Sequence, residues 1–160
     1  MGLKWREGQL QIKGLAASHG LQVFASRFQG YVENWVKWSF AGMPEAYRGI
    51  FENDAFPGLA RVPVQKERSV RKLRVDPLAA AVQEVPARNL IDRGVNVELT
   101  NLVVGEARYC SLGFEAFPDD SAMIADLTRV VEGFLATLRG IRLEGSNSRS
   151  YPEWLELVGP

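Results

Sequence analysis

Residues 95–117 constrain the fold more than any other stretch, because they predict a β-hairpin with a defined register. Two runs rich in β-branched and aromatic residues flank Gly105-Glu106, and a glycine at the first central position is typical of a two-residue hairpin turn. Val104 is then expected to pair with Ala107, which sets every other pair along the two strands. This register predicts one apolar face, which carries Val95, Val97, Leu99, Leu112, Phe114 and Ala116.

The opposite face of this hairpin is polar and holds two acidic residues. Glu98 is expected opposite Gly113, and Glu115 is then its diagonal neighbour on the other strand. Carboxylates at this separation can share a cation, and Gly113 leaves room beside them. The sequence therefore predicts a candidate metal site at Glu98 and Glu115.

Length and charge narrow the classes of protein to which this chain can belong. Its 160 residues favour one domain, residues 1–160, in which residues 145–160 form a docked or flexible tail. The formal net charge is zero, with 19 basic and 19 acidic residues. Proteins that bind nucleic acids or anionic membranes are usually basic, so neither partner is expected. The sequence does not predict the oligomeric state.

The scarcity of cysteine and histidine excludes several kinds of catalytic site. The single Cys110 cannot form an internal disulfide, and its place on the apolar face predicts a buried thiol. The single His19 lies between Ser18 and Gly20 and is expected in a loop. Histidine-based triads and clusters of histidine or cysteine ligands are therefore excluded. The sequence shows no signal peptide and no apolar run long enough to span a bilayer, which favours a cytoplasmic protein.

Basic residues dominate the polar faces of two other predicted strand regions. Residues 2–14 predict a hairpin around Glu7-Gly8, in which apolar and basic residues segregate completely to opposite faces. Residues 61–76 predict one or two strands and contain the densest positive charge in the chain. The basic residues considered as ligand contacts are Lys4, Arg6, Lys13, Lys66 and Arg68.

One further strand and three helices complete the expected elements. Residues 30–40 are rich in aromatic and β-branched residues and predict a strand. Residues 44–51 and 78–85 predict short helices. The apolar residues of 121–138 recur at helical spacing and predict a long helix.

The ionisable side chains on the strands permit two interpretations. If the polar faces all point into a closed sheet, its interior would hold cations and carboxylates and would suit a polyanion bound with Mg²⁺ or Mn²⁺. If the apolar faces form the core instead, the same side chains are simply solvated, as is common in antiparallel sheets. The alternation alone favours the second interpretation.

Several short motifs are similar, in order, to those of CYTH-domain proteins, the triphosphate tunnel metalloenzymes. L-K-W-R-E-G-Q-L-Q-I-K-G looks like the family's basic hairpin, and V-Q-K-E-R resembles its later basic strand. V-N-V-E-L-T, followed by S-L-G-F-E-A-F and a helix, is similar to the family's closing region. The motifs span residues 3–138, but each one is short.

The resemblance implies an antiparallel β-barrel whose charged interior binds triphosphate with Mg²⁺ or Mn²⁺. The family includes thiamine and inorganic triphosphatases and class IV adenylate cyclases, so the resemblance also implies a metal-dependent triphosphatase, a phosphoanhydride hydrolase. It assigns phosphate contacts to Lys4, Arg6, Lys13, Lys66 and Arg68, and metal ligands to Glu98 and Glu115.

The sequence departs from the family pattern at positions that bear on catalysis. The family's first strand carries an E-x-E-x-K signature upstream of the basic hairpin, and only three residues precede Lys4 here. Thr100 replaces the aspartate expected after V-E-L, and the expected E-I-E is reduced to Glu115. The resemblance thus implies a divergent relative that lacks part of the acidic site, or a chain that has lost its first strand.

The expected fold is α+β, an antiparallel and largely closed β-barrel of CYTH type with a long C-terminal helix packed on it. The leading functional expectation is a protein that binds a phosphorylated small molecule or polyphosphate with a divalent metal in the barrel lumen, and that hydrolyses a triphosphate if the site is complete. The alternative is a non-catalytic β-barrel module that binds a ligand or a protein partner. No residue is assigned a catalytic role.

Overall fold

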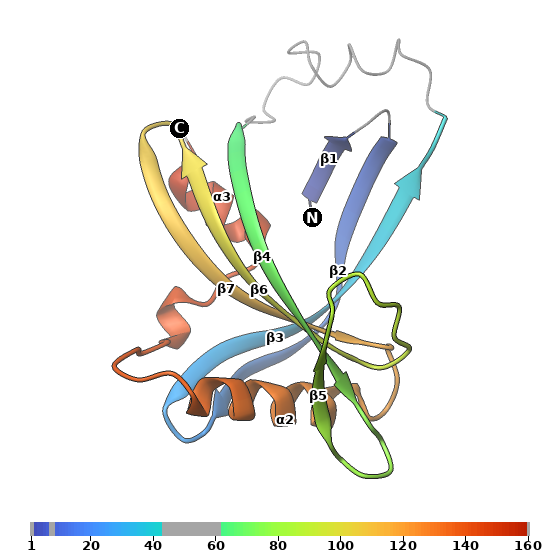
Figure 1. Cartoon of the computed structure of the whole chain (residues 1–160). Coiled ribbons are helices and arrows are strands. Elements are labelled where there is room, and N and C mark those ends of the chain that lie inside the picture. The colour runs from blue at the N-terminus through green and yellow to red at the C-terminus, as the bar shows by residue number, and fades with distance from the viewer. Residues whose placement is uncertain (1, 7–8, 43–61, 160) are drawn as a thin grey trace. The chain divides into compact units, whose positions relative to one another are not determined.

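The structure is a computed structural model that describes residues 2–6, 9–42 and 62–159. The helix expected over residues 44–51 and the turn expected at Glu7-Gly8 lie outside the described residues. The described elements are shown in Figure 1. They are strands β1 (Gly2–Arg6), β2 (Gln9–Phe24), β3 (Phe28–Phe40), β4 (Val64–Val75), β5 (Val82–Val85), β6 (Gly94–Val104) and β7 (Ala107–Phe117), helices α2 (Met123–Ala136) and α3 (Tyr151–Val158), and the 3₁₀ turn η1 (Gly145–Asn147).

The strands form two antiparallel sheets, and the chain divides into two compact units. One sheet has the order β1-β2-β3 and the other has the order β5-β4-β6-β7. The first unit comprises Met1–Val23, Gln29–Val62 and Leu143–Pro160, and the second comprises Phe24–Phe28 and Pro63–Arg142. The expected single domain stays a prediction, and each unit is described by itself.

The first unit begins with the basic hairpin. Arg6 pairs with Gln9, which confirms the register expected for residues 2–14. The loop expected at His19 is wrong, because β2 continues through this residue to Phe24. The ring Nε2 of His19 lies 3.2 Å from Asn34 Oδ1. Gly20 takes a left-handed φ of 71° inside the strand, and glycine accommodates this irregularity at no steric cost.

The C-terminal segment of the first unit is hydrogen-bonded to β3. The backbone N–H of Gln29 donates to the Leu143 carbonyl at 2.9 Å, and the N–H of Tyr31 donates to Ser148 Oγ at 2.8 Å. Helix α3 follows, and Ser150 and Glu153 cap its first turn reciprocally. Residues 143–153 are therefore tied to the sheet at one end and locally capped at the other.

The second unit contains the hairpin from which the sequence analysis started. Val104 pairs with Ala107 and Leu99 with Leu112, so the expected register is confirmed. Residues 64–75 form the single strand β4, which pairs with β6 along its length. The short helix expected over residues 78–85 is wrong. The Asp76 carboxylate accepts the N–H groups of Leu78 and Ala79 in a turn, and the chain then returns as β5.

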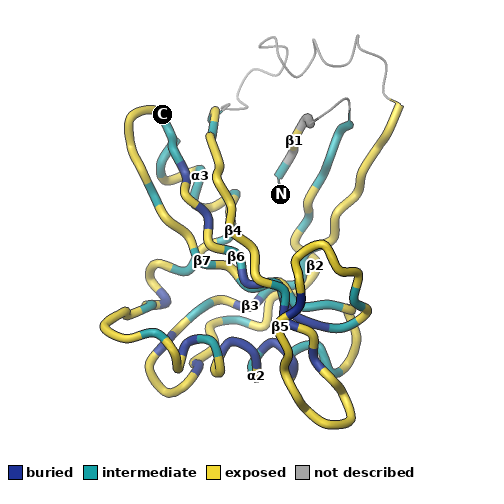
Figure 2. Tube along the Cα trace, viewed as in Figure 1, coloured by how far each residue is buried: buried dark blue, intermediate teal, exposed yellow. Residues whose placement is uncertain are grey.

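Helix α2 covers the apolar face of this sheet. The rings of Phe134 and Phe114 meet edge to face, with centroids 5.7 Å apart, and the Arg71 guanidinium lies over the Phe134 ring. Figure 2 shows buried and exposed stretches alternating along α2. The helix spans Met123–Ala136 and is therefore shorter than the expected helix over residues 121–138. The buried apolar residues of this core include Leu73, Val75, Val95, Val97, Leu127, Val130, Val131 and Leu135.

The helix covers only part of the apolar face. Val95 and Val97 are buried, whereas Leu99, two residues further along β6, is 49% exposed. Cys110 lies on the same face near the hairpin turn and is exposed. The expected buried thiol is therefore wrong, since a place on the apolar face buries a residue only where another element packs on it.

The expected closed barrel is also wrong. In residues 2–6, 9–42 and 62–159 the strands are hydrogen-bonded into two separate sheets of three and four strands. Alternation along a strand decides which side chains share a face, but closure requires hydrogen bonds between the outer strands and a matching stagger. The fold is α+β with two open antiparallel sheets. None of the described helices is long and apolar enough to cross a membrane.

Candidate functional site

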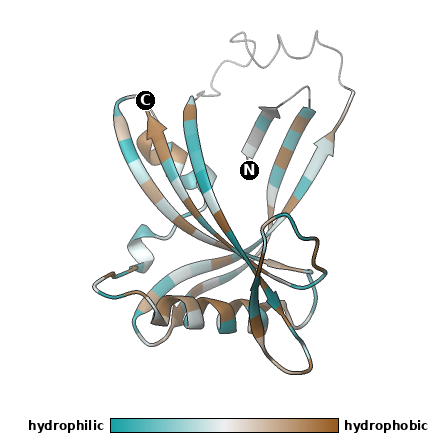
Figure 3. Ribbon diagram, viewed as in Figure 1, coloured by the Kyte–Doolittle hydropathy of each residue, from teal (hydrophilic) through white to brown (hydrophobic). Residues whose placement is uncertain are grey.

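One face of the four-stranded sheet carries a row of basic side chains. Alternate residues of a strand point to the same side, and α2 occupies the side of Arg71 and Phe114. The even-numbered residues of β4 therefore lie on the side away from α2, and Figure 3 shows the alternation along the strands. We call this side the charged face. Its polar and charged residues include Lys66, Arg68, Lys72, Arg74, Asn96, Glu98, Thr100, Ser111 and Glu115.

An ion pair with a buried hydroxyl lies at the centre of the charged face. Arg68 Nη1 donates to Glu98 Oε2 at 3.2 Å, and Thr100 Oγ1 donates to Glu98 Oε1 at 2.9 Å. The side chains of Arg68 and Glu98 are 50% and 39% exposed, so the pair contributes only about 0–1 kcal/mol to stability. Because each carboxylate oxygen of Glu98 accepts one of these hydrogen bonds, the carboxylate is held in one orientation.

A hydrogen-bond acceptor without a partner lies on the same face, two residues along β6 from Glu98. Asn96 stands between Lys72 on β4 and Glu115 on β7. Its Oδ1 is buried and is the one such side-chain atom without a hydrogen-bond partner in the described part of the chain. Lys72 Nζ donates to the Asn89 carbonyl at 2.8 Å. A buried polar atom without a partner calls for an explanation, and an ion or water at the site is one.

The two carboxylates expected to hold metal share the charged face. Glu98 lies opposite Gly113, and Glu115 follows two residues along β7, which confirms their predicted diagonal arrangement. Among the described residues, no group of three or more His, Cys, Asp or Glu side chains could hold a metal ion. Two carboxylates fit Mg²⁺ only when phosphate oxygens or water complete its coordination. The metal assignment to Glu98 and Glu115 stays a prediction.

The seven site residues expected from the sequence fall into two groups. The structure brings Lys66, Arg68, Glu98 and Glu115 onto the charged face of the second unit. The other three belong to strands β1 and β2 of a different sheet, in the first unit. These are Lys4, Arg6 and Lys13.

Two cations of the charged face are not among the residues predicted from the sequence. Lys72 and Arg74 share the even-numbered positions of β4 with Lys66 and Arg68, and Val70 stands between the two pairs, so the period-two pattern of residues 61–76 could have identified them. The motif V-Q-K-E-R ends at Arg68 and does not include them. Near the hairpin turn, a hollow of about 440 Å³ has Lys66, Arg108 and Tyr109 among its lining residues.

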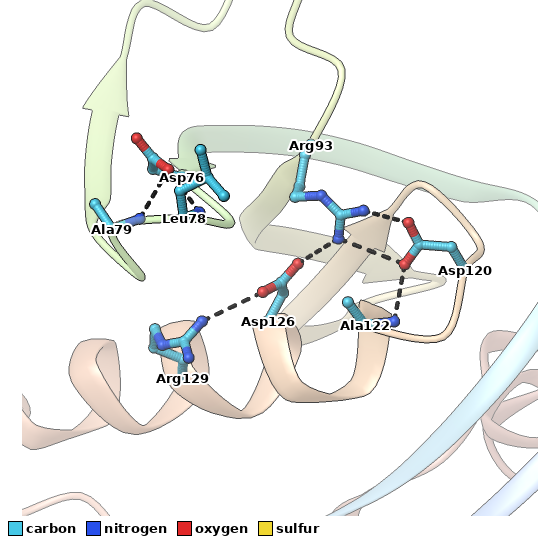
Figure 4. Close-up of polar contacts among 8 residues, drawn as sticks. All are labelled: Asp76, Leu78, Ala79, Arg93, Asp120, Ala122, Asp126 and Arg129. Atoms are coloured by element: carbon cyan, nitrogen blue, oxygen red, sulfur yellow. Dashed lines mark hydrogen bonds and ion pairs between the residues drawn. The ribbon is translucent and has the colours of Figure 1, made fainter.

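A second polar cluster, which the sequence analysis also missed, joins the loop before β6 to the start of α2 (Figure 4). Arg93 is ion-paired with Asp120 and, at 2.7 Å, with Asp126. Asp126 is also paired with Arg129 at 3.3 Å. The Asp126 side chain is 7% exposed, and a buried carboxylate requires such partners. Because its acceptors are already used, this cluster ties two segments together and is not a candidate ligand site.

The cluster predicts a contribution to acid stability. The hydrogen bond from Arg93 lowers the pKa of Asp120 below its ordinary value. A carboxyl group with a lowered pKa contributes stability above its unfolded pKa of about 4, and this is lost as the pH falls through the folded pKa. We expect the melting temperature to fall below about pH 4, and to fall less steeply in Asp120→Asn when both are followed by calorimetry. Asp92→Asn makes the same charge change outside these contacts and serves as the control. Identical acid profiles for Asp120→Asn and the wild type would contradict this.

Comparison of the chain with protein-family models, with curated proteins and with solved structures finds no match. The similarity to CYTH-domain proteins therefore rests on short sequence motifs alone.

Proposed function

We propose that this protein binds a phosphorylated small molecule or a polyphosphate on the charged face of the β5-β4-β6-β7 sheet. The observation that supports this most is that Lys66, Arg68, Lys72 and Arg74 all lie on this face of β4, as two pairs of neighbouring cations with Val70 between the pairs. Residues two apart on a strand are separated by about 6.6 Å. Each pair therefore offers two neighbouring cations to one extended anion, and lysine and arginine are the usual partners of phosphate oxygens.

The acidic residues of the same face suit a divalent cation that arrives with the phosphates. Mg²⁺ commonly uses one or two carboxylates together with substrate phosphates. We propose that Glu98 and Glu115 supply the carboxylates for Mg²⁺ or Mn²⁺. Asn96 lies opposite Glu115, and its Oδ1 has no hydrogen-bond partner. This amide oxygen could serve as a neutral metal ligand, because hard cations prefer oxygen ligands.

Hydrolysis of a triphosphate is the catalytic extension of this proposal. The basic side chains of the charged face would neutralise the phosphoryl group as it is transferred, and water would be the nucleophile. A bound divalent ion would add to this neutralisation. We further propose a small-molecule ligand rather than a nucleic acid or a membrane, since the net charge is zero. A cytoplasmic location is also part of this proposal.

The proposal is tested by titrating the protein with tripolyphosphate, with and without Mg²⁺ or Mn²⁺. At a concentration 100 times the Kd, the ligand is expected to raise the melting temperature on the order of 5 °C. Glu98→Gln and Glu115→Gln are expected to weaken the effect of the metal while tripolyphosphate alone still binds. Release of inorganic phosphate then separates an enzyme from a binding protein. No shift with any polyanion would contradict the proposal.

The alternative, an interaction module without catalysis, is favoured by one observation in the first unit. Val36, Trp38 and Phe40 of β3 are 39%, 49% and 46% exposed. Large apolar side chains exposed side by side are typical of protein-binding surfaces. This alternative predicts no response to tripolyphosphate.

A further inference from the structure

Gly113 occupies a strand position for which the fold itself gives no reason. It lies in the interior of β7, opposite Glu98, and its φ is outside the left-handed region that favours glycine. A Cβ built on Gly113 would meet no atom within 4 Å. Glycine weakens a strand interior, and it often marks a place where a ligand approaches the backbone closely.

Two other glycines of the second unit show the structural reasons that Gly113 lacks. A Cβ on Gly94 would lie 2.3 Å from the Leu73 carbonyl oxygen, so only glycine fits there. Gly105 has a φ of 57° in the hairpin turn, where a side chain would be strained. Neither a close backbone contact nor a left-handed φ explains Gly113.

The open space at Gly113 lies next to Glu98, whose carboxylate accepts two side-chain hydrogen bonds. Directly opposed residues of an antiparallel pair have Cβ atoms about 4.5–5.5 Å apart. A side chain at position 113 would therefore stand beside the Glu98 carboxylate, which Arg68 and Thr100 hold in place. The carboxylate could not turn away without losing both hydrogen bonds.

We propose that Gly113 is a specificity-determining residue, which keeps open the space where an extended phosphate-containing ligand lies across β6 and β7. This inference rests on the proposed function. Arg68 is on β4 and Gly113 is on β7, with β6 between them. The Arg68 guanidinium reaches Glu98 on β6, and Glu98 lies opposite Gly113 on β7, so a ligand that contacts Arg68 would extend over the open space at Gly113.

The test is Gly113→Val, compared with the wild type by calorimetric titration and thermal unfolding. Valine favours strands and has room here, so the melting temperature without ligand is expected to rise by roughly 2–4 °C. The affinity for tripolyphosphate is expected to fall at least tenfold, about 1.4 kcal/mol. Gly113→Ala adds a smaller side chain and is expected to give a smaller loss.

Gly133→Ala in α2 is the matched control. A Cβ on Gly133 also meets no atom within 4 Å, and its φ is outside the left-handed region. Alanine stabilises a helix relative to glycine, so this variant is expected to raise the melting temperature without changing the affinity for tripolyphosphate.

The outcomes separate this inference from the proposed function. If the wild type binds no polyanion, the proposed function fails and this inference falls with it. If the wild type binds tripolyphosphate and Gly113→Val binds it equally well, only the role of Gly113 is overturned. A lower melting temperature in both Gly113→Val and Gly113→Ala would give the glycine a folding role and would also overturn the inference.

Discussion

Phe28→Ala is expected to lower the free energy of unfolding by about 3–5 kcal/mol, measured by urea denaturation. Phe28 follows the turn between β2 and β3, yet this turn belongs to the second unit. The residue is 1% exposed, and the Arg27 guanidinium lies 4.6 Å from the centroid of its ring. Truncation would leave a cavity and remove this cation–π contact.

The neighbouring Val23 provides the control, because it is 58% exposed in the same hairpin. Val23→Ala is expected to change the free energy of unfolding by less than about 0.5 kcal/mol. Arg27 also donates to the carbonyls of Leu135 and Leu138 at the end of α2, which anchors the turn to this core. If both alanine variants had equally small effects, the turn would not be part of the hydrophobic core.

Arg68→Glu is expected to weaken the binding of tripolyphosphate on the order of 100-fold. One hydrogen bond to a charged group contributes about 1.5–3 kcal/mol, and each 1.4 kcal/mol corresponds to about tenfold in affinity. The substitution also places a second carboxylate beside Glu98. The effect on stability is expected to be at most about 1 kcal/mol, because the ion pair is exposed.

Arg88→Glu is the matched control, since Arg88 is exposed in the loop between β5 and β6. It makes the same change of net charge away from the charged face and is expected to leave the affinity within about threefold, less than 0.7 kcal/mol. The affinity of both variants for tripolyphosphate is measured by titration at several salt concentrations. Equal losses in the two variants would indicate attraction by overall charge, and no loss in Arg68→Glu would remove Arg68 from the site.

The parts of the site that could be predicted are those governed by local rules. Gly105-Glu106 sets the turn, and the turn sets the register that puts Glu98 opposite Gly113. Alternation puts Lys66 and Arg68 on one face of β4, and the pairing of β4 with β6 in the structure makes this the face of Glu98. Even the missed Lys72 follows from the same alternation. Glu98 and Gly113 face each other across one hairpin, so the distance between them depends little on the rest of the chain. Arg68 and Glu98 are 30 residues apart, so their contact depends on the pairing of β4 with β6.

The contacts that could not be predicted join distant segments. Arg93 and Asp126 are separated by 33 residues, and no pattern in either segment indicates their pairing. The exposure of Cys110 has the same origin, because it depends on where α2 ends over the sheet. His19 lies in β2 because strand pairing continues through a sequence that resembles a loop. In each case tertiary packing overrides a local preference.

The sequence by itself determined the hairpin at residues 95–117, its register and the identity of its polar and apolar faces, because side chains alternate with a period of two in any strand. Only the tertiary structure decided which face is covered and whether the sheet closes. Helix α2 packs on the face of Phe114, and the strands remain in two sheets in the described residues. The physical reason is that alternation is the same in a barrel and in an open sheet, whereas coverage and closure depend on pairings between distant parts of the chain.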